Sequence, residues 1–111
     1  MKKTTENVTA IDLLNAHGTS LPVKDVKDST ITVLKMAIDE DVDEHGELKD
    51  VGYLFADNGN VYGTISGTAI RTIDSMISYV EQGLVKLPVN IKVNMRKSKS
   101  DRDFITLQVV E

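Results

Sequence analysis

The sequence predicts one mostly β domain with a single long helix, and three observations lead to that prediction. Apolar stretches of strand length recur along the chain, several of them with strict alternation of apolar and polar residues. Asn58-Gly59 separates two of these stretches, and this pair is typical of a tight hairpin turn. Residues 66–82 instead show the three-four apolar spacing of a helix. The 111 residues are enough for one domain, residues 1–111, with its own core.

The stretch 51–65 is the predicted central hairpin. A two-residue turn at Asn58-Gly59 places Phe55 opposite Tyr62. Side chains alternate between the faces of a strand, so Tyr53, Phe55 and Tyr62 would share one face, opposite an aliphatic face that belongs to the core. Two interpretations of the aromatic face stay open: a second packed layer, or an exposed platform on which nucleobases stack.

The N-terminal third leads to the first long strand. Residues 1–9 are polar and are predicted to form a flexible arm. Residues 9–18 offer a Thr cap, apolar positions and a closing Gly, which indicates a short helical turn. Residues 19–29 contain Pro22 and alternating lysines and aspartates, as a connecting segment would. Residues 30–38 are rich in β-branched and apolar types and predict a strand covered on much of both faces.

Residues 39–50 are rich in aspartate and glutamate. A calcium-binding loop that starts at Asp41 would need a bidentate acid at its twelfth position, where the chain has Gly52. The flanking segments are also typical of strands rather than helices. We therefore interpret residues 39–50 as a solvated acidic loop between two strands, and we expect no metal site and no cofactor.

The helix is expected to begin at a cap formed by Ser66 or Thr68, and to run to about Gln82 before Gly83 ends it. Its apolar side chains follow the spacing of one buried stripe, which comprises Ala69, Ile70, Ile73, Met76, Ile77 and Val80.

A pair of strands around a basic loop closes the chain. From Pro88 onward Val89, Ile91, Val93 and Met95 point inward, and the alternate residues, Lys92 and Arg96 among them, point outward. The loop, residues 96–103, carries Arg96, Lys97, Lys99 and Arg102. In the last strand Ile105, Leu107 and Val109 are expected to point inward. Phe104 is out of phase with that set, on the face away from the core, where an aromatic ring beside a phosphate-binding loop can stack on a base.

The formal net charge of −4 is unevenly distributed. Residues 1–60 hold 12 acidic and 6 basic residues, whereas residues 84–111 hold 3 acidic and 6 basic residues. The local field matters more than the total charge for a charged ligand, so a basic C-terminal quarter remains compatible with a nucleic-acid partner.

Other classes of protein are disfavoured. Without cysteine there is no disulfide framework, thiolate nucleophile or cysteine zinc site. The start of the chain lacks the apolar region of a signal peptide, and no apolar run has the length of a membrane span, so we expect a cytoplasmic protein without membrane contact. His17 and His45 lie in unrelated polar segments, and the acidic stretch lacks the apolar surroundings that raise a carboxyl pKa for acid-base chemistry. We do not expect an enzyme.

The predicted order is strand, strand, strand, helix, strand, strand, preceded by a short N-terminal helical segment. This is the order of the OB-fold, a five-stranded barrel. Its binding face lies on strands two and three, with the loops that join strands one to two and four to five. The predicted nucleic-acid site therefore comprises Tyr53, Phe55, Tyr62, Lys92, Arg96, Lys97, Lys99, Arg102 and Phe104.

Three segments carry a resemblance to a known family: residues 60–66 (Asn-Val-Tyr-Gly-Thr-Ile-Ser), residues 93–107, and Leu13-Leu14 ahead of residues 20–25. They resemble the small single-stranded DNA-binding proteins of phages and related mobile elements of Gram-positive bacteria. The resemblance implies sequence-independent binding of single strands during replication or recombination of the element, in the cytoplasm of the host bacterium. It carries over to Tyr62, Phe104 and the four cations of the basic loop.

The resemblance also leaves questions open. Many bacterial single-strand binders recruit replication or recombination proteins through an acidic tail, and this chain ends in a strand and Glu111. DNA and RNA are not distinguished, and an exposed strand edge could pair with a second copy to form a homo-oligomer. The alternative hypothesis is a small regulatory protein that binds another protein through its acidic loop. In that case neutralising Asp41, Asp43 and Glu44 together would abolish capture of the partner.

Overall fold

The computed structural model describes residues 2–110; Met1 and Glu111 lie outside the described residues. One mixed sheet organises the molecule, in the order β2-β5-β4-β3-β6-β7, with β1 paired to β3. Its strands are β1 (Lys3–Thr4), β2 (Leu21–Pro22), β3 (Thr30–Val42), β4 (Leu48–Ala56), β5 (Val61–Thr64), β6 (Val89–Lys97) and β7 (Asp103–Val110). The helices are α1 (Ala10–Thr19), α2 (Gly67–Glu81) and a short 3₁₀ helix, η1 (Val23–Val26).

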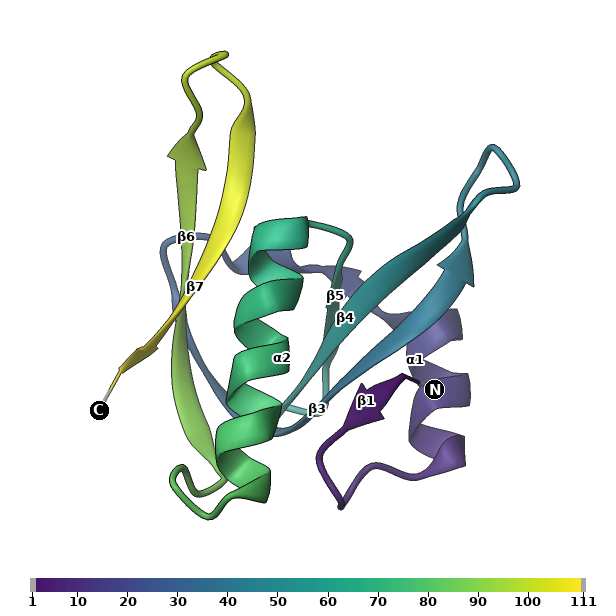
Figure 1. Ribbon diagram of the computed structural model, residues 1–111, viewed down its shortest axis with the longest axis vertical. Coiled ribbons are helices and arrows are strands. Elements are labelled where there is room, and N and C mark those ends of the chain that lie inside the picture. Colours follow the sequence, from purple (N-terminus) through teal and green to yellow (C-terminus); the bar gives the residue numbers. More distant parts are fainter. Residues whose placement is uncertain (1, 111) are drawn as a thin grey trace.

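The predicted order of elements is present, but residues 2–110 contain more strands than predicted. The succession β3, β4, β5, α2, β6, β7 matches the five strands and one helix expected from the sequence. Residues 2–110 also contain two further short strands, and the expected short N-terminal helical segment is a full α-helix, α1. The sheet curls around α2 as a half-barrel (Figure 1), and β2 and β7, the two ends of the strand order, are not paired with each other. The architecture is compatible with an OB-like fold whose barrel is not closed.

α2 fills the hollow of the curled sheet. The Oγ of Ser66, one of the two predicted caps, accepts a hydrogen bond from the backbone N–H of Ala69 at 3.5 Å. The predicted apolar stripe is confirmed, because its central members are buried against β3, β4, β6 and β7; these are Ala69, Ile73, Met76 and Ile77. Burial of this stripe is the main reason that the segment is helical in the folded chain.

α1 covers the other face of the sheet. Its start is fixed by a capping box, in which Thr9 and Asp12 each accept a hydrogen bond from the other's backbone N–H. Leu13 and Ala16 of this helix are buried in a second core, together with Ala37, Val51, Tyr53 and Phe55. The segment is therefore a ten-residue helix that continues through Gly18, not the short turn expected from the sequence.

The predicted register of the β4–β5 hairpin is wrong by one residue. Phe55 lies opposite Val61, and Leu54 lies opposite Tyr62. The backbone N–H of Gly59 bonds to the carbonyl of Ala56 at 3.2 Å, and Gly59 has a φ of 87°, whereas Asn58 has no positive φ. This is a three-residue loop with glycine in the left-handed position, not the two-residue turn expected. One extra loop residue turns Tyr62 to the opposite face from Tyr53.

Within residues 1–9, which are predicted to form a flexible arm, Lys3 and Thr4 form a strand of the sheet, β1. Lys3 and Thr4 of β1 pair with Ile38 and Ala37 of β3, and the side chain of Thr5 is fully buried. The Nζ of Lys3 also forms an ion pair with Asp74 of α2. The polar composition is accommodated because the segment lies along the sheet with its lysines at the surface.

Two hairpins project from the end of the molecule at which α2 begins (Figure 1). β3 continues to Val42 and β4 starts at Leu48, so the expected acidic loop is mostly strand and the connecting turn is residues 43–47. We call residues 39–50 the acid arm. β6 continues to Lys97 and β7 starts at Asp103, so the basic loop is also shorter than predicted. We call residues 92–106 the basic arm.

Candidate nucleic-acid interface

The tip of the basic arm is an ordered turn. The backbone N–H of Ser98 bonds to the carbonyl of Arg102 at 2.9 Å, and the N–H of Asp101 bonds to the carbonyl of Ser98 at 3.0 Å. Asp101 adopts a φ of 61°, a left-handed conformation that aspartate tolerates better than most residues. The serines that favoured a loop in the sequence also stabilise this turn. The Oγ of Ser98 accepts a hydrogen bond from the backbone N–H of Arg102 at 3.3 Å and lies 3.0 Å from the Oγ of Ser100.

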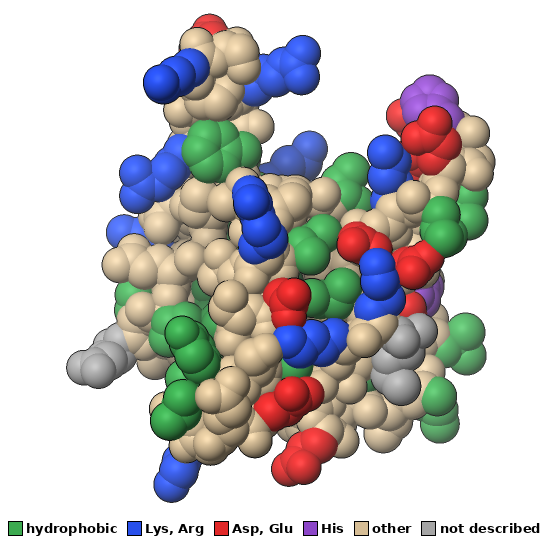
Figure 2. Space-filling model, in the orientation of Figure 1, with side chains coloured by type: hydrophobic (Ala, Val, Ile, Leu, Met, Phe, Trp, Pro, Cys, Tyr) green, Lys and Arg blue, Asp and Glu red, His purple; other side chains and the backbone are tan. Residues whose placement is uncertain are grey.

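The five predicted cations of the basic arm are all exposed: Lys92, Arg96, Lys97, Lys99 and Arg102. Lys97 pairs with Asp101 at 3.5 Å, with both side chains mostly in solvent, so this ion pair is easily exchanged for a phosphate. The arm holds five basic residues against Asp101 and Asp103. It is a cationic projection on an otherwise acidic protein, and Figure 2 shows these side chains spread around its tip.

Phe104 lies at the predicted position. It is opposite Arg96 in the β6–β7 ladder and is partly buried. A cross-strand pair of this kind places a ring and a guanidinium next to each other on one face. Base stacking and phosphate contact can therefore take place side by side at this point of the arm.

A shallow groove of about 520 Å³ runs along the base of the basic arm. Its lining comprises Lys24, Thr64, Ile65, Ser66, Met95, Asp103, Phe104 and Ile105. Thr64 and Ser66 bring the start of α2 to the groove, and Lys24 comes from η1. The groove thus combines an apolar floor with hydroxyl groups, one cation, Lys24, and one carboxylate, Asp103.

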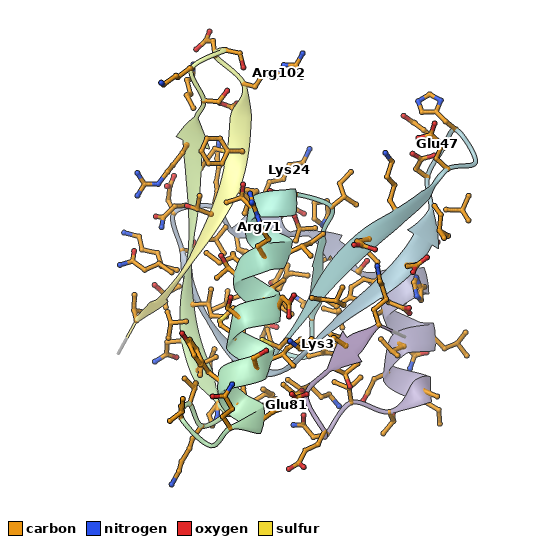
Figure 3. The ribbon with its side chains drawn as sticks, in the orientation of Figure 1. Lys3, Lys24, Glu47, Arg71, Glu81 and Arg102 are labelled. Carbon is orange, nitrogen blue, oxygen red and sulfur yellow. The ribbon has the colours of Figure 1, made fainter. Side chains whose placement is uncertain are left out.

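Two further cations accompany the arm. Figure 3 shows the side chains of Lys24 and Arg71 at the end of α2 from which the arm rises. No local signal in the sequence points to Lys24, because it lies in a connecting segment with alternating charges. The link is long-range: the N–H of Asp28 bonds to the carbonyl of Val93 at 2.7 Å, and the N–H of Val93 bonds to the carbonyl of Ser29 at 3.0 Å, which holds the segment after η1 against β6.

The prediction that Tyr53, Phe55 and Tyr62 form one aromatic face is wrong. Their exposed fractions are 1%, 6% and 4%, and Tyr62 belongs to the core around α2 whereas the other two lie under α1. Of the two interpretations left open, the packed layer is the one that the structure shows for Tyr53 and Phe55. Tyr53 and Phe55 are buried because α1 packs over β4. Nothing in the sequence of the hairpin itself indicates this contact.

The hydroxyl of Tyr53 is part of a polar cluster at the end of α1. It lies 2.9 Å from Nδ1 of His17, whose Nε2 is 2.8 Å from Asp39 and whose Nδ1 is 3.3 Å from Asp41. The hydrogen bond to Asp39 raises the pKa of His17 above 6.5. Burial is the largest single influence on Asp39 and tends to raise its pKa, but the hydrogen bonds from His17 and from the backbone N–H of Glu40 act in the opposite direction, and the net pKa is lowered. Burial, with the two aspartates, raises the pKa of Tyr53 to about 12.

The family model of the phage single-stranded DNA-binding protein matches residues 2–110. The chain belongs to this family. Membership confirms the resemblance inferred from residues 60–66 and 93–107. No curated protein and no solved structure gives a significant match to the chain.

Neither α-helix within residues 2–110 is long and apolar enough to cross a membrane. In the same part of the chain, no group of three or more His, Asp or Glu side chains is arranged to hold a metal ion.

Proposed function

We propose that this protein binds single-stranded DNA without sequence preference through the basic arm and the groove at its base. The observation that carries the proposal is the exposed cationic arm with Phe104 on it, in a member of a family of phage single-stranded DNA-binding proteins. The protein acts by binding and not as an enzyme.

The mechanism has two parts. Lys92, Arg96 and the cations of the turn neutralise phosphates and release counterions, which makes affinity depend steeply on salt. Phe104 stacks on a base, a contact that contributes about 1–3 kcal/mol and accepts any base. Lys24 and Arg71 extend the cationic path from the arm toward the start of α2.

The buried rings are not part of the proposed interface. Tyr53 and Phe55 would reach a base only after α1 moves away from β4, and Tyr62 would have to leave the core around α2. Their predicted stacking role therefore needs a conformation other than the one described.

The test is fluorescence anisotropy of a labelled oligothymidine of about thirty nucleotides, at low and moderate salt, with duplex of equal length as competitor. Phe104→Ala is expected to weaken binding by about 5- to 150-fold, the equivalent of 1–3 kcal/mol. Tyr79→Ala is the matched control, because Tyr79 is an aromatic residue of α2 with half of its surface exposed. Equal loss in both variants, or no binding at low salt, would contradict the proposal.

We infer from family membership that the bound strand is an intermediate of replication or recombination of a phage genome, in the cytoplasm of the host. An oligouridine of the same length, used as competitor in the assay above, measures whether RNA is also bound. The OB-like half-barrel agrees with this assignment in one respect: the turn of the basic arm corresponds to the loop between strands four and five, one of the loops by which OB-folds bind oligonucleotides.

A further inference from the structure

The acid arm presents an apolar pair that has no partner in its own core. Val42 and Leu48 lie opposite each other next to the turn, with exposed fractions of 59% and 64%. Glu44 and Glu47 lie in the turn beyond them, and the arm as a whole holds seven carboxylates against Lys49. Its end is therefore an apolar contact surrounded by negative charge.

The groove at the base of the basic arm has the complementary character. Ile65 is 72% exposed there, and Met95 and Phe104 are partly buried beside it. Lys24 and the carboxylate of Asp103 line the groove, and the basic arm above it, with Arg102 near its tip (Figure 3), carries a net positive charge. The groove thus offers apolar surface next to the cations of the basic arm. This is complementary to the apolar pair of the acid arm, which is surrounded by carboxylates.

The two surfaces do not meet within one molecule. The acid arm and the basic arm stand apart (Figure 1), and among residues 2–110 no ion pair joins them. The carboxylates at the outer end of the acid arm pair locally, as Glu44 does with His45 and Glu47 with Lys49. Among the described residues, no ion pair thus links Glu44 or Glu47 to a residue outside the acid arm, whereas Asp39, Glu40, Asp41 and Asp50 pair with His17 or Lys2.

We propose that the acid arm of a second copy of this chain docks in the groove at the base of the basic arm. The contact joins two different surfaces, so each added copy leaves one free acid arm and one free groove, and the association is head-to-tail. It goes beyond the proposed function, and one consequence rests on that function: DNA and the neighbouring acid arm compete for the same groove.

The first test is sedimentation velocity without DNA at low salt, where the wild-type protein is expected to associate with rising concentration. Glu44→Lys with Glu47→Lys reverses the acid arm, and Lys97→Glu with Lys99→Glu reverses the basic arm. Each double variant alone should weaken association by about tenfold or more. An equimolar mixture should restore it, because the reversed acid arm of one variant meets the reversed basic arm of the other.

Two further variants test whether the apolar pair contributes to association and whether a charge change elsewhere on the protein affects it. Val42→Ser with Leu48→Ser should also weaken association, although no charge changes. Glu81→Lys, at the far end of α2 (Figure 3), should leave it unchanged. Circular dichroism of every variant shows that the fold is kept, and all the substituted side chains are exposed.

The outcomes are distinct from those for DNA binding. A protein that binds oligothymidine yet stays monomeric at low salt overturns this inference alone, as does a mixture that fails to restore association. Assembly that dissolves when oligothymidine is added in excess supports the shared groove. Assembly that persists under excess oligothymidine overturns it.

Discussion

Single residues decide how closely the helices approach the sheet, and Gly52 shows this for α2. A Cβ at this position would lie 2.7 Å from Cδ1 of Ile73, which is fully buried, so one of the two groups must shift. Gly52→Ala is therefore expected to lower the free energy of unfolding by about 1–3 kcal/mol in urea denaturation. Gly18→Ala is the control: nothing lies within 4 Å of the added atom, and alanine in a helix should stabilise by up to about 1 kcal/mol. Equal stability of Gly52→Ala and wild type would show that Ile73 can move aside.

His17 couples the stability of α1 to pH. Its pKa is raised in the folded protein because it donates to Asp39 and Asp41. A raised pKa means that the stabilisation is fully present below the unfolded pKa of 6.5 and is lost as pH rises through the folded pKa. We expect the difference in unfolding free energy between wild type and His17→Gln to be largest below pH 6.5 and to shrink above it. His45→Gln, at the exposed turn of the acid arm, should follow the wild type in urea titrations; a difference that does not change with pH would contradict the account.

At the scale of an element, the basic arm should set the salt dependence of DNA binding. Each phosphate contact contributes about 0.7 to the slope of log affinity against log salt for single strands. Replacing Lys97, Lys99 and Arg102 by Gln should therefore reduce that slope by about 2 in anisotropy titrations. Lys86→Gln is the control, because Lys86 lies with Gly83 and Val85 near the end of α2, away from the arm. An unchanged slope in the triple variant would show that the phosphates of the bound strand contact other residues than these three.

Elements with a strong pattern of their own could be predicted from the sequence. α2 has a cap and one buried stripe, and β6 alternates without a break, so local and tertiary preferences agree there. Asn58-Gly59 suits a two-residue turn, but a three-residue loop accepts the same pair with Gly59 alone in the left-handed region. The sequence therefore does not distinguish the two-residue turn from the three-residue loop. The difference between the two places Tyr62 on opposite faces of the sheet. The length of α1 is harder to predict because its apolar residues do not form one buried stripe. Ile11 and Leu14 are apolar but 70% and 73% exposed.

For the whole molecule, the separation of charge was predictable and its spatial arrangement was not. The counts along the chain show an acidic first half and a basic last quarter, and the cations of the basic arm are exposed as expected. Because β3 and β6 are antiparallel, the two arms would leave a flat sheet in opposite directions; they project from the same end because the sheet curls, with an irregularity in β3 between Val33 and Lys35 (Figure 1). Lys24 joins the candidate site through contacts between distant segments.

This arrangement predicts that the acid arm opposes the approach of DNA. Its carboxylates stand at the same end of the molecule as the cations of the basic arm (Figure 2), so the field of one reduces the attraction due to the other. Glu44→Gln with Glu47→Gln should therefore raise the affinity for oligothymidine by about two- to fivefold at low salt. The gain should vanish near 1 M salt, where the screening length falls to about 3 Å.

Anisotropy at nanomolar protein keeps association between copies out of this measurement, because a weak contact between arms is dissociated at that concentration. Glu81→Gln removes the same kind of charge from the opposite end of α2 and should change the affinity much less at every salt concentration. If neutralising the acid arm weakened DNA binding instead, the arm would be a supporting part of the interface. Its carboxylates would then hold a neighbouring element in place rather than repel the strand.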